Sequence, residues 1–282
     1  MELETSRTRS GADPVSAAPF VSIESVGFTY PGARRPALTD TSLGIAKGEF
    51  ACILGPSGCG KSTLLSILSG LAVPDTGRVS IDGEVLYDQG HAVAEHPPAL
   101  GYVFQDPRLL PWRTVRQNLN LALKGAQVDR ARWDELVDTY LGMCGLREYA
   151  DVWPGKLSGG QRQRVAIARA LAIEPPSVLM DEPFSTLDEV TARFMRQELL
   201  DLWEPIGQTI VFVTHSIREA VFLADHVFVM SAGPGRVLER RAIDIPRPRA
   251  YEDPHLAEIE GELVAWVLEQ WGYHDATAGP TT

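Results

Sequence analysis

The sequence has few cysteines, no excess of positive charge and no long hydrophobic run. Its three cysteines (Cys52, Cys59 and Cys144) lack the spacing of a zinc site, and their odd number argues against a disulfide framework, so a reducing compartment fits best. With 26 basic and 37 acidic residues, the formal net charge is −11, which argues against a broad basic surface for nucleic acid. No apolar run approaches the roughly 18 residues of a spanning helix, so we expect no membrane crossing.

The 282 residues suffice for one or two domains. Residues 1–19 lack the apolar segment of a secretory signal, and we predict flexible tails at 1–19 and 272–282. Between them, apolar strand patterns alternate with helical patterns, as is typical of an α/β domain. The predicted strands are Val21–Phe28, Phe50–Leu54, Ala99–Phe104, Val178–Met180, Thr209–Val213 and Val227–Met230. The predicted helices follow Gly60 and span Val115–Lys124, Arg130–Cys144, Gln161–Ala172, Val190–Trp203 and Ile217–Leu223. Two consecutive helices between Thr114 and Gly145 indicate a helical insertion.

The strongest local signal is a glycine-rich loop between an apolar strand and a helix, matching the pattern G-x-x-x-x-G-K-[ST]. Small residues let backbone N–H groups curl around a phosphate, and the helix N-terminus adds the positive end of its dipole. Lys61 would reach the β- and γ-phosphate oxygens and Ser62 would hold Mg²⁺. The loop consists of Gly55, Pro56, Ser57, Gly58, Cys59, Gly60, Lys61 and Ser62.

A pair of carboxylates follows the apolar strand that ends at Met180. The carboxyl ends of parallel strands meet at one edge of a sheet, so Asp181 is expected beside the glycine-rich loop, where it would complete a Mg²⁺ site. Glu182 would orient or deprotonate an attacking water. In isolation an acidic pair is more often a solvated loop, but the glycine-rich loop favours a phosphoryl-transfer site.

A second candidate anion site is a serine and two glycines at the start of a helix. Such a start presents N–H groups and a hydroxyl at the positive end of the helix dipole. The alternative is an ordinary serine N-cap. The residues are Ser158, Gly159, Gly160 and Gln161.

These motifs together resemble those of the ATP-binding cassette (ABC) ATPases, whose signature LSGGQ stands here as Leu157–Gln161. The resemblance implies a P-loop core with an antiparallel β subdomain and an inserted helical subdomain at about 106–172, within one domain spanning 20–271. It implies ATP and Mg²⁺ as cofactors, with Gln105 joining Ser62 and Asp181 as metal ligand and Lys61, Gln105, Glu182 and His215 as catalytic residues. Tyr30 would stack on adenine, Thr63 would contact the nucleotide, and Ser185–Asp188 resembles the D-loop.

The resemblance also implies partners. ATP on the P-loop of one copy would be covered by Ser158–Gly160 of a second copy, giving an ATP-dependent head-to-tail homodimer. Segments such as Leu109–Val115 resemble importer ATPases for nitrate, sulfonate and taurine, which implies a membrane permease, a solute-binding protein and a place at the cytoplasmic face of the membrane. The permease would dock on a groove lined by Gln105 and Leu109–Trp112. An exporter or lipoprotein-release ATPase, or an ABC protein without transport, remain alternatives.

The assignment of Glu182 as the water-orienting base predicts that Glu182→Gln keeps ATP binding but lowers hydrolysis by about 100-fold or more, because the amide cannot accept the proton. Phosphate release and nucleotide binding by the purified variant measure the two effects. Turnover near that of the wild type would contradict the assignment.

Overall fold

The computed structural model describes residues 18–94 and 99–272 and is built around a six-stranded sheet. Five strands are parallel, and only β11 runs antiparallel, against β10. The central strands β3 and β9 are buried along their whole length, in agreement with their uninterrupted apolar sequences. In spatial order the strands are β11 (Val237–Ala242), β10 (His226–Met230), β3 (Phe50–Leu54), β9 (Thr209–Thr214), β8 (Ser177–Asp181) and β7 (Gly101–Val103).

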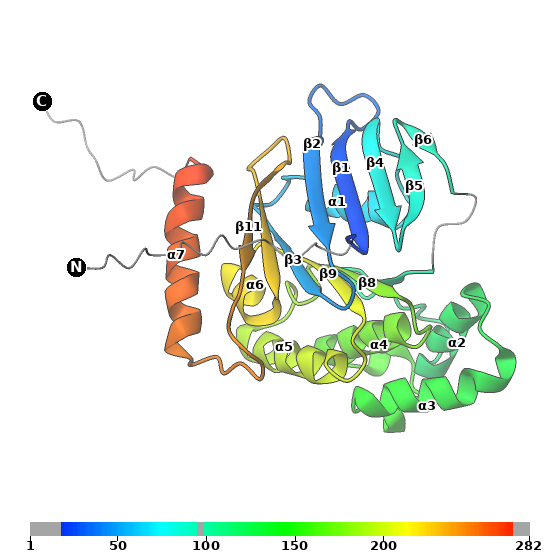
Figure 1. Ribbon diagram of the computed structural model, residues 1–282. Helices are drawn as coiled ribbons and strands as arrows, with labels where there is room; N and C mark the ends of the chain where they lie inside the picture. The colour runs from blue at the N-terminus through cyan, green and yellow to red at the C-terminus, as the bar shows by residue number, and fades with distance from the viewer. Residues whose placement is uncertain (1–17, 95–98, 273–282) are drawn as a thin grey trace, which may run out of the picture.

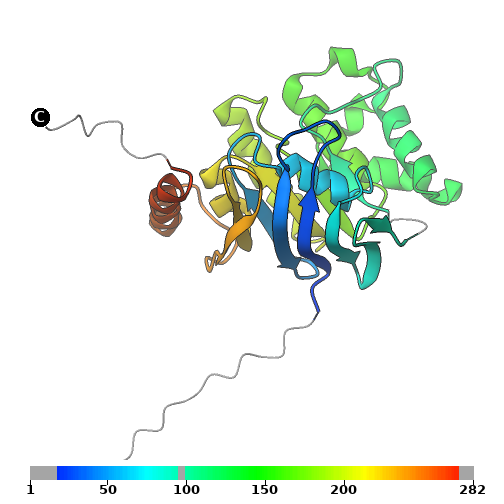
Figure 2. The ribbon, with the colours of Figure 1, turned by 90° about the horizontal axis from the view of Figure 1, so that it is seen from above.

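A second sheet of five strands is antiparallel throughout and packs with helix α1 (Lys61–Leu68) and the parallel sheet in one apolar cluster. Seen from above, its blue and cyan strands and the green helices lie on different sides of the molecule (Figure 2). Its strands, in spatial order, are β2 (Leu38–Ile45), β1 (Val21–Phe28), β4 (Thr76–Ile81), β5 (Glu84–Asp88) and β6 (His91–Ala92).

The remaining helices share a second apolar cluster with the parallel sheet. The helices α2 and α3 lie at one end of the molecule and α7 at the other (Figure 1). Three short 3₁₀ turns, Arg130–Arg132, Arg147–Tyr149 and Pro154–Lys156, connect the helices that follow β7. The helices are α2 (Val115–Gly125), α3 (Trp133–Met143), α4 (Gly159–Leu171), α5 (Glu189–Trp203), α6 (Ile217–Leu223) and α7 (Pro254–Gln270).

All six strands predicted from apolar runs are present, and the antiparallel sheet implied by the family resemblance is found as well. Five strands escaped the pattern search because their sequences are mixed. The edge strand β11, for example, carries charged residues at Glu239–Arg241 and is buried nowhere along its length. Helix α4 begins two residues earlier than predicted, since Ser158 caps it at Gly159. Most of the two predicted tails, residues 1–17 and 273–282, lies outside the described residues.

Within the described residues no helix is both long and apolar enough to pass through a bilayer.

Candidate functional site

The glycine-rich loop runs from the end of β3 to the first turn of α1 and encloses the Lys61 ammonium group. Gly58 and Gly60 have φ angles of 79° and 106°. These values favour glycine, because a Cβ would clash with the backbone in this conformation. The Nζ atom of Lys61 donates to the carbonyl oxygens of Gly55 at 2.8 Å and Pro56 at 3.0 Å. Its third neighbour is Oε1 of Glu182, at 3.4 Å. A buried cation is thereby satisfied inside the loop.

The Ser62 hydroxyl, on α1, donates to Oδ1 of Asp181 at the end of β8, over 3.0 Å. Burial raises the pKa of the Asp181 carboxyl, although the bond from Ser62 opposes this effect. A hydroxyl and a carboxylate held together are oxygen ligands of the kind Mg²⁺ prefers. Gln105, after β7, has its amide nitrogen bonded to Ser185 Oγ at 3.1 Å, so its amide oxygen is the atom available as a further ligand. These residues fit a magnesium ion.

Glu182 lies between Lys61 and His215. Its Oε2 atom is 2.9 Å from Nδ1 of His215, which follows β9, while Oε1 faces Lys61. The backbone of Glu182 has a φ of 43°, an unfavourable value for a residue with a side chain. It is fixed there by the bond from its N–H to the carbonyl of Val213 and by the Ser185 hydroxyl, which donates to its carbonyl at 2.9 Å.

A cavity of about 490 Å³ opens over these groups. Tyr30 lies at its rim, 49% exposed, with its hydroxyl 3.0 Å from Oγ1 of Thr63 and its ring edge-on to Phe28. An exposed aromatic face beside a phosphate-type loop suits a flat heterocycle. The lining residues are Tyr30, Ala37, Ser57, Gly58, Gly60, Lys61, Ser62, Thr63, Gln105, Asp181 and Glu182.

Three residues of the glycine-rich loop, predicted to bind the nucleotide, do not line this cavity: Gly55, Pro56 and Cys59. The carbonyls of Gly55 and Pro56 are bonded to Lys61. The Cys59 thiol is fully buried in the apolar cluster, which raises its pKa, and a Cβ at Gly55 would stand 2.6 Å from its sulfur. Cys59 therefore fills the space beneath the loop, and only its backbone can face a ligand.

A second cavity, of about 370 Å³, lies at the start of α4, beside the segment from Thr186 to Asp188. Ser158 caps the helix: its hydroxyl accepts from the N–H of Gln161 at 3.2 Å, and Gln161 Oε1 accepts from the N–H of Ser158 at 2.9 Å. The hydroxyl proton of Ser158 is left to donate. A Cβ at Gly160 would meet Thr191 at 3.2 Å, so the glycine allows close packing on α5.

The two cavities have no lining residue in common among the residues described. Ser185 also belongs to the site. The sequence placed it in the segment that resembles the D-loop but did not indicate its contacts. Its hydroxyl joins the Gln105 amide to the Glu182 carbonyl. In the segment predicted to face a partner, Trp112 is 66% exposed, whereas Leu109 packs against the core.

A phosphate loop, a Ser–Asp oxygen pair and a Glu–His pair at the carboxyl edge of a parallel sheet define a P-loop nucleotide-hydrolase fold and site. The family model for "ABC transporter" matches residues 38–185, and the chain belongs to that family as an ABC-type ATPase.

Individual relatives agree with this assignment. The chain is 41% identical to "Nitrate import ATP-binding protein NrtD" of Synechococcus elongatus, over 91% of this chain and 94% of that protein. It is 46% identical to "Taurine import ATP-binding protein TauB" of Pseudomonas aeruginosa, over 79% and 82%. The dimeric post-hydrolysis structure of the ATP-binding cassette MJ0796 with ADP and Pi superposes with a TM-score of 0.69 at 33% identity, covering 80% of this chain and all of that one. The structure of cbiO1 from Clostridium perfringens, part of the transporter complex cbiONQ, gives 0.72 at 27% identity, over 91% and 97%.

The raised pKa of Asp181 predicts that the ionised carboxylate lowers the stability of the fold while it serves the activity. A raised pKa means that the folded state holds the proton more tightly, so this group's contribution to stability falls as the pH rises from its ordinary value of 3.8 through the folded value. Above that range its carboxylate is a constant penalty. Asp181→Asn is therefore expected to have an equal or higher Tm at pH 7–8 without nucleotide. Its magnesium-dependent hydrolysis is expected to fall by about 100-fold or more.

Thermal unfolding at pH 4 and pH 8, with phosphate release at pH 8, measures both effects. A Tm that drops more at pH 8 than at pH 4 would contradict the prediction, because it would mean that the carboxylate stabilises the fold.

Proposed function

We propose that this protein is the ATP-hydrolysing subunit of an ABC importer, acting at the cytoplasmic face of the membrane as a dimer around two ATP molecules. The observation that carries the proposal is the convergence, on one cavity, of Lys61, the Ser62–Asp181 pair and Glu182, whose carboxylate contacts His215. Gln105 and Tyr30 lie on the same cavity and would contact the γ-phosphate side and the adenine, respectively.

Phosphate binding would first change the contacts of Lys61. The ammonium group has three N–H donors, and its three neighbours are two carbonyls and the Glu182 carboxylate. A phosphate oxygen placed in the loop would compete with Glu182 for Lys61. Glu182 would then be released from Lys61 while His215 keeps its other oxygen at 2.9 Å.

Released in this way, Glu182 is the base that would orient the attacking water, since it lies at the cavity between Lys61 and His215. Ser62 and Asp181, with Gln105, would hold Mg²⁺, which when bound neutralises charge on the phosphate oxygens. His215 fixes the orientation of the Glu182 carboxylate. The backbone N–H groups of the loop and the Lys61 ammonium would stabilise the charge that develops on the phosphate.

The two anion sites support a head-to-tail dimer. No residue of the described chain lines both cavities, so in this proposal a nucleotide held by Lys61 in one copy is covered by Ser158 and Gly160 of another. The structure of MJ0796, a dimeric cassette bound to ADP and Pi, supports this arrangement. The γ-phosphate would supply the contacts that favour the closed dimer, and hydrolysis would remove them.

The dimer model predicts that Glu182→Gln protein is monomeric without nucleotide and dimeric with ATP. Adding Ser158→Arg, which places a bulky cation against the facing phosphate site, is expected to abolish the shift. Sedimentation velocity measures the association. The matched control Arg162→Ala changes a charge in the same helix outside the second cavity and is expected to leave the dimer intact. ATP-dependent dimers of the Ser158→Arg double variant would exclude the arrangement.

Import of a small solute such as nitrate, taurine or a sulfonate is the direction and substrate class that the names of the similar proteins support. The alternative is an exporter or lipoprotein-release ATPase. The chain can be reconstituted in liposomes with the proposed permease and solute-binding protein. ATP-driven accumulation of the solute on the ATPase side supports import, and movement in the opposite direction supports the alternative.

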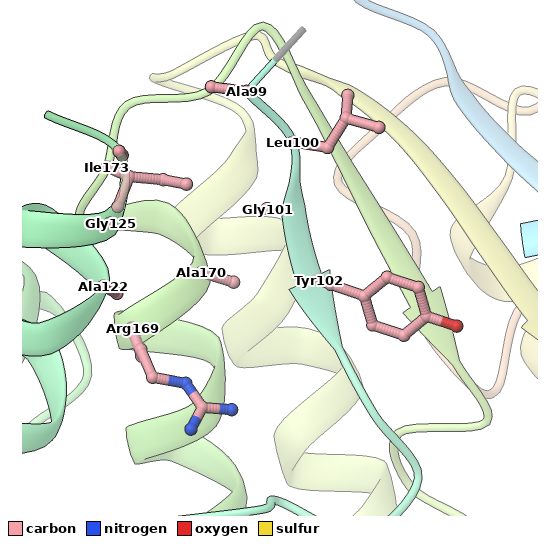
Figure 3. A pocket seen from close by; sticks show the side chains of 10 residues that line it. Ala99, Leu100, Gly101, Tyr102, Ala122, Gly125, Arg169, Ala170 and Ile173 are labelled. Carbon is pink, nitrogen blue, oxygen red and sulfur yellow. The ribbon is translucent and has the colours of Figure 1, made fainter. Parts of the chain in front are cut away.

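The permease partner would dock beside the segment that follows Gln105. An apolar groove of about 320 Å³ lies between the edge strand β7 and helices α2 and α4, and Figure 3 shows Ile173 and Ala170 on its helical side. Arg169 lines the groove and donates at 2.9 Å to the carbonyls of both Pro107 and Arg108. The groove thus adjoins the segment that leads to the exposed Trp112. A cytoplasmic helix of the permease would cover both.

This docking surface predicts that Trp112→Ala leaves the ATPase activity and the Tm of the isolated subunit nearly unchanged, because the indole is 66% exposed. Assembly with the permease is expected to weaken by about tenfold or more, the loss typical of an interface aromatic. Co-purification and solute uptake measure the effect. Leu71→Ala, at a residue 69% exposed, is the control and is expected to assemble normally. Normal uptake with Trp112→Ala would place the docking surface elsewhere.

A further inference from the structure

Arg196 of α5 and Glu219 of α6 form a buried ion pair that takes no part in the reaction as described above. Arg196 Nη2 lies 2.9 Å from Glu219 Oε1, and the two side chains are 5% and 8% exposed. Arg196 Nε donates to the same oxygen at 3.0 Å. Buried ions lose hydration that their attraction only partly replaces, so such a pair is a weak source of stability. The role of the ion pair is therefore better explained by the segments that it holds in place than by a gain in stability.

The second oxygen of Glu219 reaches the segment around His215. Glu219 Oε2 accepts from the hydroxyl of Thr214, and that hydroxyl accepts from the N–H of Ser216 at 2.9 Å. The Ser216 hydroxyl in turn accepts from the N–H of Glu219 at 3.3 Å. These bonds form a ring through the residues on either side of His215. Because Glu219 orients the Thr214 hydroxyl, it also fixes the backbone that carries the imidazole.

The other end of Arg196 reaches the segment that follows Glu182. Arg196 Nη1 donates to Glu189 Oε1 at 3.0 Å and to the Tyr251 hydroxyl at 2.8 Å. Glu189 is the first residue of α5, directly after the segment whose Ser185 is bonded to Gln105 and to the Glu182 carbonyl. Arg196 therefore contacts one carboxylate next to His215 and another next to the segment 185–188.

We propose that Glu219, anchored by Arg196, is a positioning residue for hydrolysis: through the Thr214 hydroxyl it holds His215 at the distance from which it orients Glu182. The pair also joins the His215 segment to the segment 185–188. This inference rests on the proposed role of His215 and Glu182. Neither Glu219 nor Arg196 lines the nucleotide cavity.

The test removes the connecting hydroxyl without changing the shape of the side chain. Thr214→Val is expected to lower kcat for ATP about tenfold, the size expected for one buried hydrogen bond that is needed in the transition state, with KM for ATP within about twofold of the wild type. The ¹⁵N signals of the His215 imidazole are expected to lose the signature of an Nδ1 hydrogen bond. Thr214→Ser, which keeps the hydroxyl, is expected to restore both.

The matched control is Thr209→Val at the other end of β9, where the threonine hydroxyl accepts from the N–H of Gly48 at 2.9 Å. This control loses one part-buried hydrogen bond from the same strand, and its kcat is expected to remain at the wild-type value. A second variant replaces both charges, Arg196→Met with Glu219→Leu. Its Tm is expected to equal or exceed that of the wild type while kcat stays low, because an apolar pair can fill the space but cannot orient Thr214.

The outcomes separate the inference from the function on which it depends. If His215→Ala abolishes hydrolysis but Thr214→Val and the apolar pair keep the wild-type kcat and imidazole signals, the positioning role is wrong and the proposed function stands. If His215→Ala itself hydrolyses ATP at the wild-type rate, the proposed role of His215 fails and the inference fails with it. If Thr209→Val lowers kcat as much as Thr214→Val does, the role of the Thr214 hydroxyl is purely structural and the inference is wrong.

Discussion

The buried ammonium group of Lys61 is the contact on which the rest of the site depends. A cation this far from water must be surrounded by acceptors, and the chain supplies two loop carbonyls and the Glu182 carboxylate. The loop carbonyls require the tight turn at Gly58 and Gly60, and the carboxylate requires that the end of β8 lie close to the end of β3. The strand order provides the second requirement. Since β9 lies between β3 and β8, its carboxyl end delivers His215 to the other side of Glu182.

Much of the fold, and the placement of the candidate site residues within it, could be predicted from the sequence because both depend on local patterns. The loop from Gly55 to Ser62 carries its own geometry in its glycines, and the buried strands around it are continuous apolar runs. The carboxylates after Met180 could be placed at the same edge because parallel strands all end there. The placements that could be predicted are those that a short segment determines by itself or by its position at the end of a strand.

The features that were not predicted depend on pairs of residues far apart in the chain. Nothing in the sequence indicates that Ser185 joins Gln105 to the Glu182 carbonyl, or that Glu182 has a positive φ, because both follow from the packing of three separate segments. Likewise Cys59, which lies within the motif, has its thiol in the core, since the turn directs its side chain toward Gly55. In the antiparallel sheet, strands β2 and β4 are half exposed, so their composition is mixed and their pattern weak.

Helix α6 lies between the candidate site and the C-terminal part of the chain, and a buried charged side chain holds each of its ends. Glu219 fixes its first turn, as described above. At its other end Arg249, 4% exposed, donates through Nη1 to the carbonyls of Val221, Phe222 and Ala224, groups that a helix terminus leaves without partners. Its Nη2 atom donates to the carbonyl of Ile243, the residue that follows β11. A helix of seven residues tied in this way has little freedom to rotate, so displacement of His215 requires the bonds of Thr214 to change rather than the helix to turn. This restriction supports the proposal that the Thr214 hydroxyl, rather than the bulk of the helix, sets the position of the imidazole.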